Sequence, residues 1–161
     1  MAYRMHTDYL HQLYLNNDLA EGRYVALGET LDLAAVDVPM FVVGTETDHV
    51  APWKSVYKVG KLVRSRDYTF CLTSGGHNAG IISGPVHPKR RHRVFTTKAG
   101  ARLPSPAQFM KTVEPAPGSW WPTFAAWLAG HSTKTRVAPP KMGAAGYKPV
   151  CNAPGEYVLA R

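Results

Sequence analysis

Two continuous apolar runs mark the first half of the chain, residues 40–43 (MFVV) and residues 68–72 (YTFCL). Apolar residues in unbroken succession, rather than in alternation, are typical of strands covered on both faces, as in a parallel α/β sheet. Between the runs, Pro52 is well placed in the first turn of a helix that we expect to reach about Val63. The pattern therefore predicts a βαβ unit, in which a right-handed crossover joins two parallel strands.

The segment before the first run is predicted to hold one long helix. Residues 3–17 place apolar side chains at helical spacing, and we expect the helix to end near Asn16 and Asn17. Residues 18–28 are predicted to be a loop. Residues 31–36 are a short apolar segment, for which we expect one helical turn, because Pro39 forbids its continuation as a helix.

The second half of the chain carries weaker signals. We expect a short strand at residues 94–97 and a loop over residues 99–118, which contain four prolines. Ser119 is a suitable N-cap for an aromatic-rich helix from Trp120 to about Gly130. Residues 133–161 are predicted to be an extended, proline-rich tail. We see no internal repeat, and we expect residues 1–161 to form a single domain.

Composition narrows the class of protein. The chain has 161 residues, of which 45% are hydrophobic, enough for a real core. It contains no run of about 18 apolar residues, so no membrane span is expected, and no apolar N-terminal segment typical of a signal peptide. The two cysteines, Cys71 and Cys151, are expected to be reduced thiols in a cytoplasmic protein. The Cys and His spacings match no zinc pattern, and we expect no metal site.

The net charge of +8 favours anionic partners. Part of it lies in residues 88–93 (PKRRHR). This run is interpreted as a solvated loop, with a phosphate contact or a nucleic-acid contact as alternatives. The run lacks the interleaved aromatic residues that single-strand binders use for stacking, so nucleic acid is not expected as a partner.

Candidate chemistry follows each of the two predicted strands. Asp48 lies in the loop after the first strand, and His77 lies in the glycine-rich loop TSGGHNAG (73–80) after the second. The carboxyl ends of parallel strands share one edge of a sheet, where ligands bind in open α/β folds. A carboxylate there can orient an imidazole, which then takes a proton from a nucleophile. The plainer alternatives are that Asp48 caps the helix near Pro52 and that His77 is a non-catalytic loop histidine; His49 is expected to point away from Asp48.

A nucleophile is harder to find. In the α/β-hydrolase order it precedes the acid along the chain, on a Gly-x-Ser-x-Gly or Gly-x-Cys-x-Gly turn. Neither motif occurs in the sequence, and the residues before Val38 are too few for the strands that normally precede the acid. Cys71 lies within a predicted strand, where a buried thiol behaves as a small apolar residue. We therefore expect an α/β fold that is the last part of a hydrolase fold, with the acid and the base but without the half that carries the nucleophile.

Five strings of the chain carry a family resemblance: LYLNNDL (13–19), VDVPMFVVGTETDHVAPWKSVYK (36–58), FCLTSGGHNAGI (70–81), GSWWPTFAAWL (118–128) and APGEYVLAR (153–161). They resemble the C-terminal part of the polyhydroxyalkanoate synthases, the poly(3-hydroxybutyrate) polymerases, and the likeness runs over essentially the whole chain. The resemblance implies an α/β-hydrolase catalytic domain in which Asp48 matches the catalytic aspartate and His77 the catalytic histidine. The family's cysteine nucleophile belongs to an upstream turn, and this sequence begins after it.

The resemblance also implies the reaction. The family transfers 3-hydroxyacyl groups from coenzyme A thioesters to a growing polyester through a Cys-His-Asp site, and its aspartate helps to activate the incoming hydroxyl. We expect this chain to be inactive alone, to need no cofactor beyond its 3-hydroxyacyl-CoA substrate, and to associate with itself or with a missing N-terminal half. The resemblance further places it at the surface of polyester granules. The alternative is a non-catalytic binding module built on the same fold.

Four tryptophans invite two interpretations, core packing or a grip on an apolar polymer. They are Trp53, Trp120, Trp121 and Trp127. Aromatic residues at helical spacing are more often core, and within the last helix Trp120, Phe124 and Trp127 are predicted to share one face.

Overall fold

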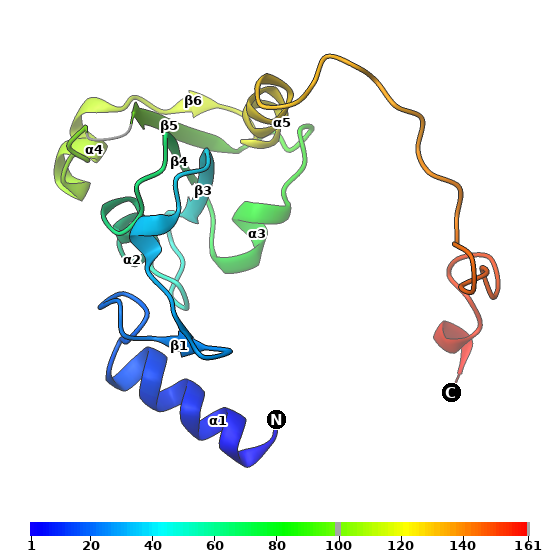
Figure 1. Ribbon diagram of the computed structural model, residues 1–161. Coiled ribbons are helices and arrows are strands. Elements are labelled where there is room, and N and C mark those ends of the chain that lie inside the picture. Colours follow the sequence, from blue (N-terminus) through cyan, green and yellow to red (C-terminus); the bar gives the residue numbers. More distant parts are fainter. Residues whose placement is uncertain (99–100, 161) are drawn as a thin grey trace. The chain divides into compact units, whose positions relative to one another are not determined.

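The computed structural model describes residues 1–98 and 101–160. The chain divides into two compact units, Met1–His131 and Ser132–Arg161, and each is described by itself. The first unit holds a sheet and its helices, and the second holds the proline-rich segment (Figure 1). The expectation of a single domain over residues 1–161 stays a prediction.

A four-stranded sheet forms the centre of the first unit, with its strands in the order β3-β4-β5-β6 (Figure 1). β3 (Met40–Thr45) and β4 (Asp67–Thr73) are parallel, and the crossover between them contains the α-helix α2 (Trp53–Val56) and the 3-10 helix η3 (Tyr57–Lys61). The predicted βαβ unit is thus confirmed, although its helix tightens to 3-10 geometry after one turn. β5 (Arg91–Lys98) and β6 (Ala116–Pro117) continue the sheet in antiparallel fashion.

An aromatic core fills one face of the sheet. The rings of Tyr57 and Phe70 meet edge to face with centroids 4.7 Å apart, and the rings of Phe70 and Phe109 are 5.5 Å apart. Such pairs add to the free energy gained by burying their area. The buried members of this core are Tyr57, Tyr68, Phe70, Leu72, Leu103 and Phe109.

The opposite face of β3 is covered by the last helix, α5 (Trp121–Gly130). The ring of Phe41 lies 5.2 Å from that of Phe124, 5.6 Å from that of Trp127 and 6.2 Å from that of Trp120. The predicted shared face of this helix is confirmed. β3 is therefore covered on both faces, as its continuous apolarity predicts.

The predicted loop over residues 99–118 is wrong for part of its length. It contains helix α4 (Pro106–Thr112) and strand β6, while residues 99–100 lie outside the described residues. Ser105 and Gln108 form a capping box, in which each side chain bonds to the other residue's backbone N–H. Proline count alone is misleading here, because Pro106 occupies a first-turn position that helices accept.

The segment before β3 begins with a helix. α1 (Tyr3–Tyr9) continues into a π-helix, η1 (Leu10–Leu15), close to the predicted bounds. A short hairpin of β1 (Val25–Ala26) and β2 (Glu29–Thr30) begins within the predicted loop and extends past its end. The predicted helical turn is the 3-10 helix η2 (Leu33–Ala35). Many large apolar side chains of the helix stay exposed, namely Tyr3, Met5, Tyr9, Leu10, Tyr14 and Leu15.

The second unit has little regular structure. It contains one isolated bridge between Ala144 and Tyr147 and a single 3-10 turn, η4 (Tyr157–Leu159). Over residues 1–98 and 101–160, no helix combines the length and the apolar character needed to cross a membrane.

Replacement of Phe109 tests whether α4 belongs to the core. Phe109 is fully buried, whereas its neighbour Met110 is 38% exposed. We expect Phe109→Ala to lower the free energy of unfolding by about 3–5 kcal/mol, because it leaves a cavity among aromatic rings. Met110→Ala, the matched control, should cost much less. Urea denaturation of both variants would measure the difference, and equal losses would contradict the packing of α4.

Candidate active site

The parallel register of β3 and β4 brings two loops together at one edge of the sheet. Thr45 and Thr73, the last residues of the two strands, lie opposite each other. The connection continues beyond the strands, because Glu46 N–H donates to Thr73 O at 2.9 Å and Thr47 N–H donates to Gly75 O at 3.1 Å. The loop after each strand is thereby held against the other.

Asp48 is fixed within the first of these loops. Its Oδ1 accepts hydrogen bonds from the backbone N–H groups of Val50 (2.9 Å) and Ala51 (2.8 Å), and the Thr45 hydroxyl donates to its Oδ2 at 3.3 Å. Asp48 therefore closes the turn before α2, which is one of the roles that the sequence leaves open. Only 8% of its side-chain surface is exposed.

The second loop brings His77 to the same carboxylate. His77 Nδ1 lies 3.0 Å from Asp48 Oδ2 and 3.1 Å from Oδ1. Because an ionised carboxylate only accepts hydrogen bonds, Nδ1 carries the proton and donates. The side chain of His77 is 43% exposed, and among the described residues Nε2 has no hydrogen-bond partner. The imidazole is thus oriented by the carboxylate, with a free lone pair on its other nitrogen.

Hydrogen bonding keeps Asp48 ionised. The bond from Ala51 N–H, helped by those from His77 and Val50, lowers the pKa of Asp48 to about 2 and outweighs the opposite effect of burial. At neutral pH the site therefore holds a carboxylate that can stabilise a protonated imidazole.

Close backbone packing positions the helix that begins at His77, α3 (His77–Ile82). A Cβ at Gly80 would lie 2.6 Å from Thr45 Cγ2 and 3.0 Å from Ser74 O. The glycine thus lets α3 approach the end of β3. Gly75 has a φ of +107°, which side-chain-bearing residues rarely adopt. The glycines of the loop thus allow the backbone geometry that positions His77.

Arg90 is a positioning residue that the sequence analysis does not single out. Its Nε donates to Ser83 Oγ at 2.9 Å, while its two terminal nitrogens donate to Ala79 O at 3.0 Å and Ser74 O at 3.3 Å. The guanidinium therefore ties both ends of the His77 loop together. The only signal in the sequence is its place in the basic run 88–93.

The aromatic helix braces the same loop from its other end. The indole N–H groups of Trp120 and Trp121 both donate to Ile81 O, at 3.1 and 2.9 Å, and the Ser119 hydroxyl donates to Ser83 O at 2.8 Å. The two tryptophans thus hold the C-terminal end of α3. Trp53 packs instead in the aromatic core, 5.9 Å from Phe109.

The basic run is not a solvated loop, which corrects that interpretation. Arg91 forms an ion pair with Glu46 at 2.6 Å, and Arg93 donates to Val113 O. His92 is buried, and its two ring nitrogens bond to Gly118 O and Thr123 Oγ1. The second half of the run, from Arg91, forms the start of β5, where these side chains already have partners within the protein.

The first unit has one cysteine, Cys71, and it forms no hydrogen bond with the imidazole of His77. Cys71 is completely buried in β4, and burial raises its pKa to about 12. A thiol in that state supplies almost no thiolate at neutral pH. Cys151 is exposed and belongs to the second unit.

A carboxylate and an imidazole at the ends of adjacent parallel strands are the acid and base arrangement of α/β-hydrolase-type enzymes. The mixed α/β sheet is consistent with part of that fold. Comparison with known proteins narrows the class. The chain is 39% identical over 155 residues to the poly(3-hydroxyalkanoate) polymerase subunit PhaC of Cupriavidus necator. The aligned region covers 95% of this chain and 25% of that protein.

Two further relatives are also poly(3-hydroxyalkanoate) polymerases. The PhaC subunit of Rhizobium etli is 33% identical over the whole chain and 24% of its own length, and poly(3-hydroxyalkanoate) polymerase 2 of Ectopseudomonas oleovorans is 32% identical over 98% of the chain and 27% of its own length. No family model matches the chain. By sequence the chain is a relative of the poly(3-hydroxyalkanoate) polymerases and corresponds to a C-terminal fragment of them, about a quarter of their length.

Titration of Asp48 tests the hydrogen-bonding account of its ionisation. We expect the carboxyl resonance of Asp48 to titrate near pH 2, and to stay well below 3.8 in His77→Ala, because Ala51 N–H is the main cause of the shift. Because the pKa of Asp48 is lower in the folded state than in the unfolded state, its ionisation stabilises the fold at pH values above 3.8. This contribution is lost as the pH falls through about 2. A midpoint at the ordinary value in NMR would contradict this account.

Replacement of Arg90 tests its role in holding the His77 loop. Arg90→Met removes three hydrogen bonds, each contributing about 0.5–1.5 kcal/mol, so we expect amide exchange at Gly80 to accelerate about tenfold or more. Lys89→Met is the matched control, because the Lys89 side chain is exposed and has no partner among the described residues. Unchanged exchange in Arg90→Met would exclude this bracing role.

Proposed function

We propose that this chain is the C-terminal part of a polyhydroxyalkanoate polymerase and supplies the acid and base of its acyl-transfer site. The observation that carries the proposal is the contact of His77 Nδ1 with Asp48 at 3.0 Å, at the carboxyl edge of the sheet. The sequence likeness to PhaC subunits over nearly the whole chain supports it.

The proposed chemistry begins with a proton transfer. His77 Nε2 accepts the proton of a cysteine thiol, and Asp48 stabilises the imidazolium that forms. The thiolate attacks the carbonyl carbon of a 3-hydroxyacyl-CoA thioester. The bond from that carbon to the sulfur of coenzyme A then breaks, and the leaving thiolate takes the proton from His77. The acyl group is left as a thioester on the cysteine.

Chain growth requires a second transfer at the same site. The hydroxyl of another 3-hydroxyacyl unit gives its proton to the same imidazole and attacks the cysteine thioester, which forms an ester bond and frees the thiol. One histidine can serve both steps because an imidazole nitrogen can accept a proton and then give it up again. No further cofactor takes part in this scheme.

The nucleophile of this scheme comes from outside the described site. Cys71 is unsuitable, because it is buried within β4 and its pKa is raised to about 12. We therefore propose that a polypeptide segment related to the upstream part of the PhaC subunits brings the cysteine to Nε2, and that this chain alone does not turn over substrate.

Two exposed features support association with such a segment or with a second copy. β3 is covered on both faces by packed side chains but is the edge strand of the sheet in the described residues, so its outer backbone groups are available for pairing. The apolar side chains of α1 and η1 are also uncovered. We propose that an added strand lies against β3, and that the assembly works in the cytoplasm at the surface of polyester granules.

One observation favours a second candidate, a non-catalytic binding module. Nε2 of His77 has no hydrogen-bond partner among the described residues of the first unit. In this alternative, the Asp48–His77 pair persists as a turn-closing contact, and the fold serves attachment to granules or to other proteins.

Release of coenzyme A from (R)-3-hydroxybutyryl-CoA separates the two candidates. We expect none from the purified chain, and release once a separately produced upstream part of the Cupriavidus necator PhaC subunit is added. His77→Ala should abolish that release, whereas Cys71→Ala should preserve it.

Two outcomes would overturn parts of the proposal. Release by the chain alone that is lost in Cys71→Ala would identify Cys71 as the nucleophile. No release from a mixture that co-elutes in size-exclusion chromatography would favour the non-catalytic module.

A further inference from the structure

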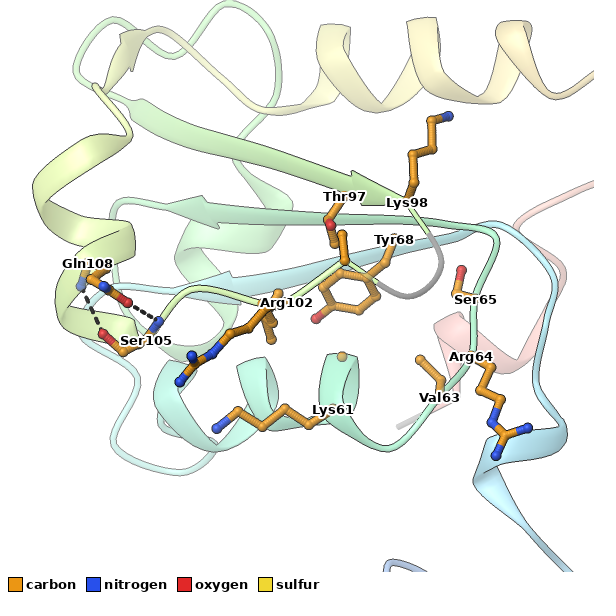
Figure 2. A pocket seen from close by; sticks show the side chains of 13 residues that line it. Lys61, Val63, Arg64, Ser65, Tyr68, Thr97, Lys98, Arg102, Ser105 and Gln108 are labelled. Atoms are coloured by element: carbon orange, nitrogen blue, oxygen red, sulfur yellow. Dashed lines mark hydrogen bonds between the residues drawn. The ribbon is translucent and has the colours of Figure 1, made fainter.

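A cavity of about 650 Å³ opens at the other end of the sheet from Asp48 and His77 (Figure 2). It lies where β4 begins and β5 ends, and is lined by η3 and by residues 101–108. Its volume is in the range of small-molecule sites. Strand β4, from Asp67 to Thr73, separates it from the acid–base edge by about 20 Å at 3.3 Å per residue.

The charge of the lining is one-sided. Lys61, Arg64, Lys98 and Arg102 line the cavity, and no acidic side chain does. Lys98 is already paired, because its Nζ lies 3.0 Å from Asp67 Oδ2. The side chains of Lys61 and Arg102 have no partner among the described residues.

The orientation of the four cationic side chains distinguishes two of them from the others. In Figure 2 the side chains of Lys61 and Arg102 extend in the same direction on one side of the cavity, whereas those of Arg64 and Lys98 point away from them. Lys61 ends η3, and Arg102 comes from the segment before α4, so two separate elements contribute unpaired cations to the same cavity. Two cations that line one cavity without a carboxylate are an arrangement that an anion would stabilise.

The wall beside this pair is closely built. Tyr68 is 2% exposed and lines the cavity, yet its hydroxyl has no hydrogen-bond partner among the described residues. Its ring is pressed against Gly60, where a Cβ would lie only 2.7 Å from Tyr68 Cζ. Thr97, on the neighbouring strand, also has a hydroxyl without a partner in residues 1–98 and 101–160. The wall beside the two unpaired cations is thus built from a buried tyrosine ring and a threonine.

We propose that this cavity binds a phosphorylated small molecule, with its phosphate between Lys61 and Arg102. A guanidinium presents a planar fork of donors that matches phosphate oxygens, and an ammonium adds a compact second charge. The remaining volume, walled by Tyr68 and Leu103, accommodates an apolar or planar part of the ligand. This site is separate from the proposed acyl-transfer site and does not depend on it.

Titration of the full chain with inorganic pyrophosphate, followed by two-dimensional NMR, tests the proposal. We expect shifts at the amides of Lys61, Tyr68, Thr97 and Leu103. Lys61→Gln and Arg102→Gln should each weaken binding at least tenfold. Lys58→Gln is the matched control, because Lys58 is an exposed cation of the same helix η3 that does not line the cavity.

Two comparisons make the outcome decisive. Succinate, a dicarboxylate, should bind more weakly than pyrophosphate if the site is built for phosphate. His77→Ala should leave pyrophosphate binding unchanged, so failure here is distinguishable from failure of the proposed enzyme function. The proposal is overturned if pyrophosphate causes no shifts at the cavity, or if Lys58→Gln weakens binding as much as Lys61→Gln does.

Discussion

The parallel pairing of β3 with β4 is the constraint on which the candidate site depends. Its register ends both strands at the same level, Thr45 opposite Thr73, and two further backbone hydrogen bonds hold the following loops together. Asp48 and His77 meet only because each follows one of these ends. A shift of the register by one residue would turn the side chains of β4 to the other face and separate the pair. The strand register thus positions the two loops, and many of the surrounding contacts hold these loops in place.

Support for the pair comes from several parts of the chain. Backbone N–H groups hold Asp48, whereas His77 depends on glycines that let α3 approach β3. Arg90 and the two indoles at Trp120 and Trp121 then fix the ends of the His77 loop. An imidazole that is oriented in this way loses little conformational entropy when it takes a proton, which suits it to repeated transfers.

The cationic side chains of the chain fall into two groups. Arg90, Arg91 and Arg93 are engaged with carbonyl groups or with Glu46, so they stabilise the fold around the site. Lys61 and Arg102 have no such partners and face the cavity at the far end of the sheet. A net charge from composition cannot distinguish these roles, because both groups contribute equally to it. The two groups differ in whether their side chains have hydrogen-bond or ion-pair partners. This difference leads us to infer an anion site away from the basic run.

The sequence by itself determined β3, β4, the helix between them and the last aromatic helix, because each is specified by local periodicity. It also placed Asp48 and His77 at strand ends, where sheet geometry predicts their approach. Only the tertiary structure decided that α4 joins the core, since Phe109 is buried by rings distant in sequence, although the helix itself begins at a local capping box. The same holds for the antiparallel pairing of β5, whose strand at residues 94–97 the sequence did predict, for the bracing by Arg90 and for the cavity beside Lys61. Each of these depends on contacts between residues far apart along the chain, which local pattern does not encode.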